Sequence, residues 1–495
     1  MTSVSCFYLL AFLPLIASLF CLLIPFKRLC FWVSILSILS AITLVTKNIP
    51  DLINFKSIGN DYNLALLSLS LEFRLNLLSA TFLIIALTAK AIILIYFKSD
   101  VEELLDDKNK GKFYAAFLVN LFALINIFTT NRYFNLFVFL EIYAFSFFAI
   151  SSISKDCDLL KISFRDFCLN VASSILLLLS FLVAFLIFKK SGFDQPISSD
   201  ISGSNLIILL LIFFVSISIL FKFFPFWLFF EKMKNANSIA SYLIAESMVV
   251  KGIVGFFIAM KFVYFFFGKD FIFANEIASQ IFLVVGIILV IFGSIGVYQQ
   301  KHLQPICGYF CLVNSGFIIC AISLNNEYSL RSIVFYLINF GLVNLFIFCL
   351  SSFLKKHLDS SSFSKIRILK NNHKFIALPL KLSIFFIASF PLTPMFFGNW
   401  NLAYVGLNPS FDSAILIALV VSNFVNIELS LRLFDSLYEK SDEAEEGSAA
   451  LLSQSKASFY SFAFWAIILL ISYVTLFAAN FGYLSQNLAS YLLSI

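Results

Sequence analysis

The chain has 495 residues, of which 61% are hydrophobic and only 13% are charged, and its formal net charge is +6. No water-soluble core could bury this much apolar surface, so the composition excludes the soluble classes and indicates a polytopic membrane protein. The nine cysteines show no C-x-x-C spacing and lie in or beside apolar runs. That placement argues against disulfide frameworks, zinc sites and iron–sulfur ligation, and we expect no metal.

Apolar windows long enough to cross a bilayer predict an all-α fold with about fourteen transmembrane helices. Lys and Arg are concentrated in the connections after the odd-numbered spans, so the positive-inside rule predicts that both termini face the outside. We expect one integral membrane transport domain over residues 1–495. The predicted spans are 4–25, 29–46, 77–97, 113–130, 133–152, 167–188, 205–224, 240–265, 277–298, 303–324, 332–354, 376–397, 411–433 and 457–480.

Two early spans carry charged residues at membrane depth. Lys90 lies inside 77–97, and we interpret it mainly as structural. Glu141 lies near the middle of 133–152, where a charge costs roughly 2.5 to 3.5 kcal/mol on insertion scales. A carboxylate placed there should face other helices, water or a basic partner. We interpret Glu141 as a proton-handling group; the alternative is a neutral side chain that hydrogen-bonds a neighbouring helix.

The seventh and eighth spans contain the next buried charges. Lys222 precedes Pro225, which removes a backbone donor and should interrupt its helix. Lys251 lies in the middle of the eighth span, and such a buried lysine can be poised to take up and release a proton. Glu246 precedes Lys251 by five residues. In an α-helix that spacing is about 140° of rotation, so we expect these two residues to lie on different faces and Glu246 to pair elsewhere or to line a water-filled cavity.

Several segments, taken in order, resemble the antiporter-like subunits shared by respiratory complex I and the multisubunit Mrp-type cation/proton antiporters. FNLFVFLEIYAFSFFAI is similar to the fifth helix of that family, and FPFW and MVVKGIVGFF are similar to its seventh and eighth helices. QPICGYFCLVNSGFI resembles the tenth helix, FYLINFGLVNLFIF the eleventh, and SFPLTPMFFGNW the broken twelfth. The resemblance covers about residues 60–440, with additional helices at both ends.

The resemblance implies a line of charged residues along the membrane plane and two inverted repeats, each with a broken helix. Protons would pass from Glu141 through Lys222 to Lys251. Pro225 and the pair Pro391 and Pro394 would mark the helix breaks. We expect a secondary polar path formed by Glu246, Asn314, Ser315, Asn344 and Asn399.

The sequence departs from the family pattern in the second half. The eleventh-helix lysine falls on Asn344 and the twelfth-helix charge on Asn399. Lys222 stands three residues before Pro225, whereas the family places its lysine five residues before the proline. A neutral amide can hydrogen-bond a water chain but cannot store a proton. The input half of the path is therefore expected to be present and the output half impaired.

Two functions remain open at this stage. The first is a proton-translocating subunit of a complex I-like or Mrp-like assembly in a bacterial inner membrane, with other membrane subunits as partners and Na⁺ or K⁺ as candidate coupled ions. The second is a non-conducting structural paralogue that serves assembly of the complex. No flavin, nucleotide or cluster motif occurs, so we expect no cofactor and no nucleic acid, and any NADH-quinone oxidoreductase activity would belong to the complex.

Overall fold

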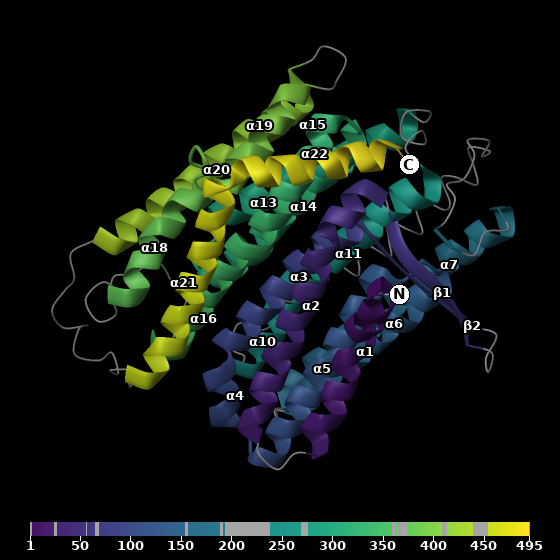
Figure 1. Ribbon diagram of the computed structural model, residues 1–495. Helices are drawn as coiled ribbons and strands as arrows, with labels where there is room; N and C mark the ends of the chain where they lie inside the picture. The colour runs from purple at the N-terminus through teal and green to yellow at the C-terminus, as the bar shows by residue number, and fades with distance from the viewer. Residues whose placement is uncertain are drawn as a thin grey trace. The chain divides into compact units, whose positions relative to one another are not determined.

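Helices account for nearly all of the chain that the computed structural model describes (Figure 1), which confirms the predicted all-α class. The helices form two compact units, unit 1 over Met1–Phe271 and unit 2 over Ile272–Ser494. The single transport domain over residues 1–495 stays a prediction. The described residues are 2–23, 27–55, 57–64, 69–153, 157–188, 192–193, 238–268, 276–358, 363, 366, 374–407, 413–438 and 454–494.

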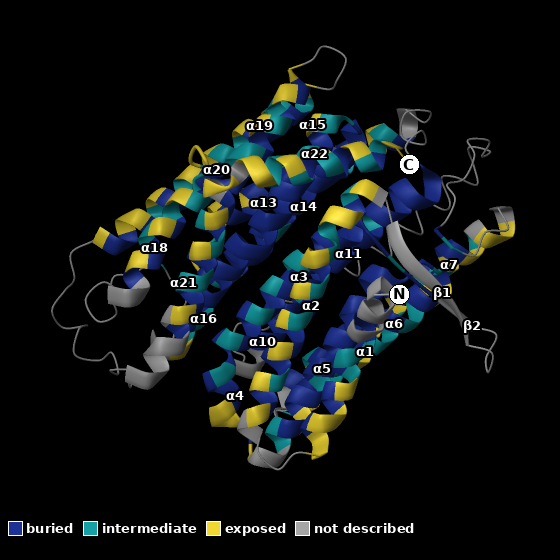
Figure 2. Cartoon of the chain, in the orientation of Figure 1, coloured by how far each residue is buried: buried dark blue, intermediate teal, exposed yellow. Residues whose placement is uncertain are grey.

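Among these residues, ten helices are long and apolar enough to cross a membrane, or up to eleven if a bent pair near the C-terminus forms one span. Predicted span 205–224 with Lys222, and Pro225 directly after it, lie outside the described residues. The count of about fourteen spans and the helix break at Pro225 therefore stay predictions. Two of the spans are almost entirely buried, namely 241–267 in unit 1 and 327–356 in unit 2. Burial differs between spans, as Figure 2 shows: α14 (Leu303–Leu324) is mostly dark blue, whereas α20 (Ala414–Tyr438) alternates with yellow exposed positions.

Unit 1 contains the helices that carry the predicted charges. Helix α1 packs against α5, α5 against α6, and α6 against α7. The elements of unit 1 are α1 (Thr2–Leu23), α2 (Lys27–Phe55), β1 (Ser57–Leu64), β2 (Leu69–Asn76), α3 (Leu77–Tyr96), α4 (Lys98–Leu104), α5 (Asp107–Thr129), α6 (Tyr133–Ser152), α7 (Cys157–Phe188), α10 (Ser238–Ala245), the π-helix η2 (Glu246–Val250), α11 (Lys251–Lys261) and the π-helix η3 (Phe262–Phe267).

The hairpin formed by β1 and β2 was not expected from the apolar windows. Its antiparallel register runs from the pair Ser57 and Asn76 to the pair Leu64 and Leu69. Asn76 then caps α3, because its Oδ1 accepts a bond of 2.7 Å from the Ser79 N–H while the Ser79 hydroxyl oxygen accepts one of 2.9 Å from the Asn76 N–H. This reciprocal capping box satisfies two backbone donors at the helix start. Helix α3 therefore begins at Leu77, as predicted.

Unit 2 contains α13 (Glu276–Gln299), α14 (Leu303–Leu324), α15 (Glu327–Ile338), the π-helix η4 (Asn339–Val343), α16 (Asn344–Leu358), α18 (Lys374–Ile387), α19 (Pro394–Gly406), α20 (Ala414–Tyr438), α21 (Gln454–Leu476) and α22 (Ala478–Ser494). Helices α13 and α14 approach each other through small residues. A Cβ on Gly316 would lie 2.6 Å from the Gly286 carbonyl oxygen, and a Cβ on Gly286 would lie 2.9 Å from the Gly316 oxygen. Such glycines let membrane helices touch backbone to backbone.

The predicted span 376–397 is divided in the structure. Helix α18 ends at Ile387 and α19 begins at Pro394, and the connection contains Ser389 and Leu392 with positive φ values of 54° and 77°. Thr393 caps α19, with its hydroxyl oxygen accepting a bond of 3.3 Å from the Phe396 N–H. A proline at the first helical position loses no intrahelical bond, so Pro394 suits the start of α19.

Candidate functional site

A buried ion pair joins Lys251, the first residue of α11, to Asp166 of α7. The Lys251 Nζ lies 3.1 Å from the Asp166 Oδ2, and the two side chains are 5% and 1% exposed. Asn170 donates a second bond of 3.1 Å to the same oxygen, and the Lys251 Nζ lies 4.0 Å from the centre of the Phe147 ring. The Asp166 carboxylate and the Phe147 ring stabilise the positive charge of Lys251, and the Asn170 amide stabilises the carboxylate.

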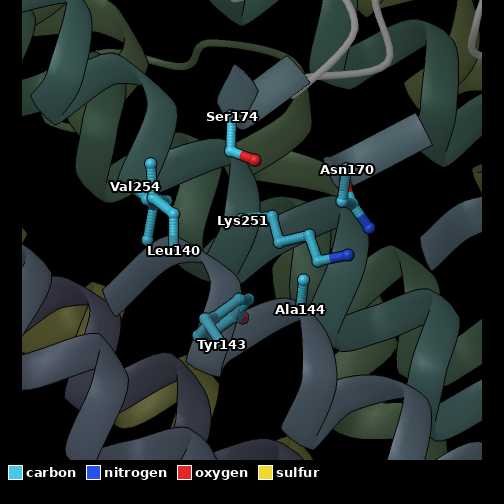
Figure 3. A pocket seen from close by; sticks show the side chains of 7 residues that line it. All are labelled: Leu140, Tyr143, Ala144, Asn170, Ser174, Lys251 and Val254. Carbon is cyan, nitrogen blue, oxygen red and sulfur yellow. The ribbon is translucent and has the colours of Figure 1, made fainter. Parts of the chain in front are cut away.

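A small cavity lies beside Lys251. Its volume is about 20 Å³, and Figure 3 shows the Lys251 side chain among its walls with the nitrogen directed toward Asn170. A cavity of this size holds about one water molecule when polar groups line it. The walls come from α6, α7 and α11, and they are Leu140, Tyr143, Ala144, Asn170, Ser174, Lys251 and Val254.

Ser174 connects this cavity to Glu141. Its hydroxyl donates a hydrogen bond to the Glu141 Oε1 and also lies 2.8 Å from the Val171 carbonyl oxygen. A serine hydroxyl carries one proton, so it can donate to only one of these two acceptors at a time. Glu141 itself is half-buried. Glu141 and Lys251, two of the predicted proton-transfer residues, are therefore connected through Ser174 and the cavity, and the predicted intermediate Lys222 lies outside the described residues.

A second buried ion pair lies in the same unit, between Lys90 of α3 and Glu246 at the start of η2. The Lys90 Nζ lies 2.5 Å from the Glu246 Oε1, and the two side chains are 0% and 1% exposed. Lys90 also donates to the Asn120 Oδ1 and lies 4.9 Å from the centre of the Phe117 ring. Tyr143 donates its hydroxyl proton to the same Glu246 Oε1 over 2.9 Å. Lys90 is thus a fully paired buried cation and does not snorkel.

The π turn changes the predicted relation between Glu246 and Lys251. The Lys251 N–H bonds to the Glu246 carbonyl oxygen, five residues earlier. A turn closed by this i→i+5 bond contains more residues than an α-turn, so five residues amount to little more than one turn. The expected separation of about 140°, which holds for an α-helix, is therefore wrong here. The two side chains nevertheless have different partners, as predicted.

The polar residues predicted in unit 2 are all neutral and lie apart from these ion pairs in the sequence. The Asn339 amide donates to the Asn314 Oδ1 over 3.0 Å. Asn399 accepts a bond of 2.5 Å from the Tyr336 hydroxyl. Within the described part of the chain, both side-chain polar atoms of Asn344 are buried without a hydrogen-bond partner.

Ser315, the remaining residue of the predicted polar path, donates back to its own helix, at the Cys311 carbonyl oxygen 2.6 Å away. The Asn399 side chain also acts as a donor, because its amide donates a bond of 2.7 Å to the Asn423 Oδ1. Among the described residues, no three His, Cys, Asp or Glu side chains gather closely enough to hold a metal ion.

Asp166 was missing from the predicted site although the sequence contains a signal for it. Asp166, Asn170 and Ser174 follow one another at intervals of four residues, which places them on one face of a helix. A polar stripe of this kind inside an apolar span indicates a buried polar contact. The ion pair of Lys90 was also not predicted, because its partner Glu246 lies 156 residues away in the sequence.

The chain matches a known family over the region that contains most of these residues. The sequence pattern described as "NADH:quinone oxidoreductase/Mrp antiporter, TM" matches residues 130–425. One curated relative, "NADH-quinone oxidoreductase subunit N" of Rickettsia felis, is 27% identical over 126 residues. That alignment covers 25% of this chain and only 28% of the relative.

Two solved structures share the fold over nearly the whole chain. A chain of the Mrp complex from Dietzia sp. DQ12-45-1b superposes with a TM-score of 0.80 at 14% identity, covering 98% of this chain and 96% of that one. A chain of respiratory complex I from Thermus thermophilus gives a TM-score of 0.75 at 15% identity, covering 98% of this chain and 99% of that one. At such low identity the likeness concerns the fold.

Proposed function

Since the chain belongs to the NADH:quinone oxidoreductase/Mrp antiporter transmembrane family, we propose that it is a proton-translocating subunit of a multisubunit membrane complex. The observation that carries the proposal is the Lys251–Asp166 ion pair beside a cavity of about 20 Å³. A scaffold would gain by losing such charges, because each buried ion costs several kcal/mol to desolvate.

The proposed path begins at Glu141 and reaches Lys251 through the cavity. A proton on Glu141 passes to the Ser174 hydroxyl as that hydroxyl gives up its own proton to a water in the cavity. The water then protonates Lys251 when its amine is neutral. Asp166 stabilises the resulting ammonium, and in the absence of that positive charge it would remain as a buried anion. Release of the Lys251 proton therefore requires a nearby acceptor.

We further propose that the partners are other membrane subunits of a complex I-like or Mrp-like assembly in a bacterial plasma membrane. The Rickettsia felis relative and the two solved structures are named as parts of assemblies of these two kinds. In an Mrp-like assembly the proton would move against Na⁺ or K⁺. Copurification separates the two assemblies, because quinone-site and iron–sulfur subunits would accompany the chain only in a respiratory complex.

A second candidate function is a non-conducting structural paralogue that serves assembly. The neutral residues of unit 2 favour it, since Asn344 and Asn399 stand at the positions where the resemblance places charges. In this case the ion pairs of unit 1 would hold helices together without exchanging protons. Both candidates predict assembly, and only the first predicts proton flux that depends on Lys251.

The test is proton flux into vesicles that contain the purified complex. Lys251→Ala should abolish flux while the complex still assembles, and Lys251→Arg should also fail because a guanidinium does not release its proton. Glu141→Gln should cause a similar loss, since an amide cannot carry the acidic proton.

Lys261→Met is the matched control. Lys261 is a second buried lysine of α11, 3% exposed, and it donates to the Thr130 carbonyl oxygen. The complex with Lys261→Met should assemble and keep its proton flux. Undiminished flux in Lys251→Ala would contradict the proposal and favour the structural paralogue.

A further inference from the structure

The two buried ion pairs of unit 1 share one side chain between them. Tyr143 lines the cavity beside Lys251, and its hydroxyl donates 2.9 Å to the Glu246 Oε1. It is buried, at 3% exposure. The Lys90 Nζ lies 5.8 Å from the centre of its ring. Tyr143 therefore lies between a cavity next to one ion pair and the carboxylate of the other.

Glu246 has unused hydrogen-bonding capacity in this buried position. Its Oε1 accepts from both Lys90 and Tyr143, whereas its Oε2 is buried and has no hydrogen-bond partner among the described residues. A buried carboxylate oxygen without a partner costs free energy, and its lone pairs remain available to a further donor. Among the described residues, Glu246 contacts Lys90 from α3 and Tyr143 from α6, and Tyr242 from α10 lies near enough to interact with its charge.

From this arrangement we propose that Glu246 is a second proton-accepting group, which receives the proton released by Lys251 through the cavity water and the Tyr143 hydroxyl. The inference rests on the proposed proton translocation and gives the proton an acceptor inside unit 1. Tyr143 is the bridge and Glu246 the acceptor. No charged group of unit 2 takes part.

The transfer conserves protons and charge. Lys251 gives one proton to the cavity water, the water gives one to the Tyr143 oxygen, and Tyr143 gives its own hydroxyl proton to Glu246. Before the step the four charges of Lys90, Glu246, Lys251 and Asp166 sum to zero. After it Lys251 and Glu246 are neutral, and the Lys90 cation and the Asp166 anion still sum to zero. The net charge of the four groups therefore stays at zero. The Lys90 ammonium and the Asp166 carboxylate each lose their counter-ion during the step, and Asn120 and Asn170 keep one hydrogen bond to each of them.

The surroundings of Lys90 fit the protonated state of Glu246. When Glu246 becomes a neutral acid, the Lys90 ammonium keeps the Asn120 Oδ1 as an acceptor and the Phe117 ring at 4.9 Å. Asn120 is itself held in place, because its amide donates 3.0 Å to the Ser146 hydroxyl oxygen and 3.2 Å to the Tyr143 carbonyl oxygen. The ammonium thus retains a fixed hydrogen-bond acceptor and a cation–π contact while its counter-ion is neutral.

The first test measures proton flux of the whole complex in vesicles. Tyr143→Phe keeps the ring and removes the bridging hydroxyl, so flux should fall about tenfold or more, in line with the loss of a positioned proton-transfer group. Tyr114→Phe is the matched control, because Tyr114 of α5 is also buried, at 2% exposure, and packs against Phe31 and Phe113 away from the proposed path. Its flux should remain unchanged. Equal flux in Tyr143→Phe and Tyr114→Phe would overturn the role of the hydroxyl.

The second test detects the proton on Glu246 without measuring transport. Infrared difference spectra of the purified complex between high and low pH should contain a protonated-carboxyl signal that Glu246→Gln removes. The double variant Lys90→Met with Glu246→Gln also removes the uncompensated lysine charge and should lack the signal as well. A spectrum unchanged in both variants would overturn the inference even if Lys251→Ala abolishes flux. Conversely, if Lys251→Ala leaves flux intact, the proposed function fails while the infrared signal still reports on Glu246.

Discussion

Each unit contains a π turn that ends directly before a polar residue of its most buried span. In unit 1 the turn Glu246–Val250 precedes Lys251, and in unit 2 the turn Asn339–Val343 precedes Asn344. The side chains around the first turn are paired ions, whereas those around the second are neutral amides. The same irregularity of the backbone therefore occurs beside charged side chains in unit 1 and beside neutral side chains in unit 2. The ability to exchange protons is expected to follow the charges and not the shape of the helix.

The largest effect is expected where the charges of unit 1 are left unbalanced. Asp166→Asn removes the carboxylate that pairs with Lys251 in the described part of the chain and leaves the ammonium buried beside a neutral amide. Breaking a buried ion pair in this way costs about 3–5 kcal/mol, so thermal unfolding of the purified complex should shift to lower temperature and proton flux should be lost.

The control for this change is the double variant Asp166→Asn with Lys251→Met. It removes both charges, so it should recover most of the lost stability and none of the flux. If Asp166→Asn alone were as stable as the unmodified chain, the ion pair would not be the feature that distinguishes unit 1.

A smaller effect is expected from the helix contact that supports unit 2. Gly316→Ala would place a Cβ 2.6 Å from the Gly286 carbonyl oxygen, and the helices α13 and α14 would have to move apart. Overpacking of this kind typically costs about 1–3 kcal/mol, measurable as a lower unfolding temperature. Gly482→Ala in α22 is the matched control, because nothing lies within 4 Å of its added Cβ. Equal stability of the two variants would show that α13 and α14 adjust freely.

The smallest effect on stability is expected at Asn344, and this variant tests the contrast between units 1 and 2 most directly. Its amide is buried with both polar atoms unpartnered among the described residues, and such a group costs about 1–3 kcal/mol. Asn344→Leu should therefore leave stability unchanged or raise it by about 1 kcal/mol, with proton flux unaltered. A loss of flux in this variant would show that unit 2 conducts through its neutral residues, and the contrast between the units would not hold.

Several parts of the fold were accessible from the sequence because they depend on local patterns. The apolar run 133–152 coincides with α6, and 303–324 coincides with α14. Pro391 lies in the gap between α18 and α19, and Pro394 is the first residue of α19. The β-hairpin before α3 was missed although β2 alternates strictly between apolar and polar residues from Leu69 to Asn76. An alternating strand of eight residues gives no signal in a search for apolar runs long enough to cross a bilayer.

The π turns were not predictable from spacing. Residues Glu246 to Val250 have the composition of an ordinary membrane helix. A π turn replaces regular i→i+4 hydrogen bonds by i→i+5 bonds, and it is rare in the absence of favourable packing around it. An α-helical reading therefore placed Glu246 and Lys251 too far apart around the helix axis. The error concerns only geometry, since the choice of Lys251 as a site residue depended on its depth in the span.

The sequence alone determined that this protein lies in a membrane. It also determined which residues form most of the helices and which spans carry a charge that is costly to bury. Tertiary structure decided the partners of those charges. Lys90 meets Glu246 and Lys251 meets Asp166 across 156 and 85 residues of chain, and no local pattern encodes such a distance. The physical reason is that burying a charge is a property of one residue and its neighbours in sequence, whereas compensating it requires an opposite charge that only the packing of several helices can bring within hydrogen-bond distance.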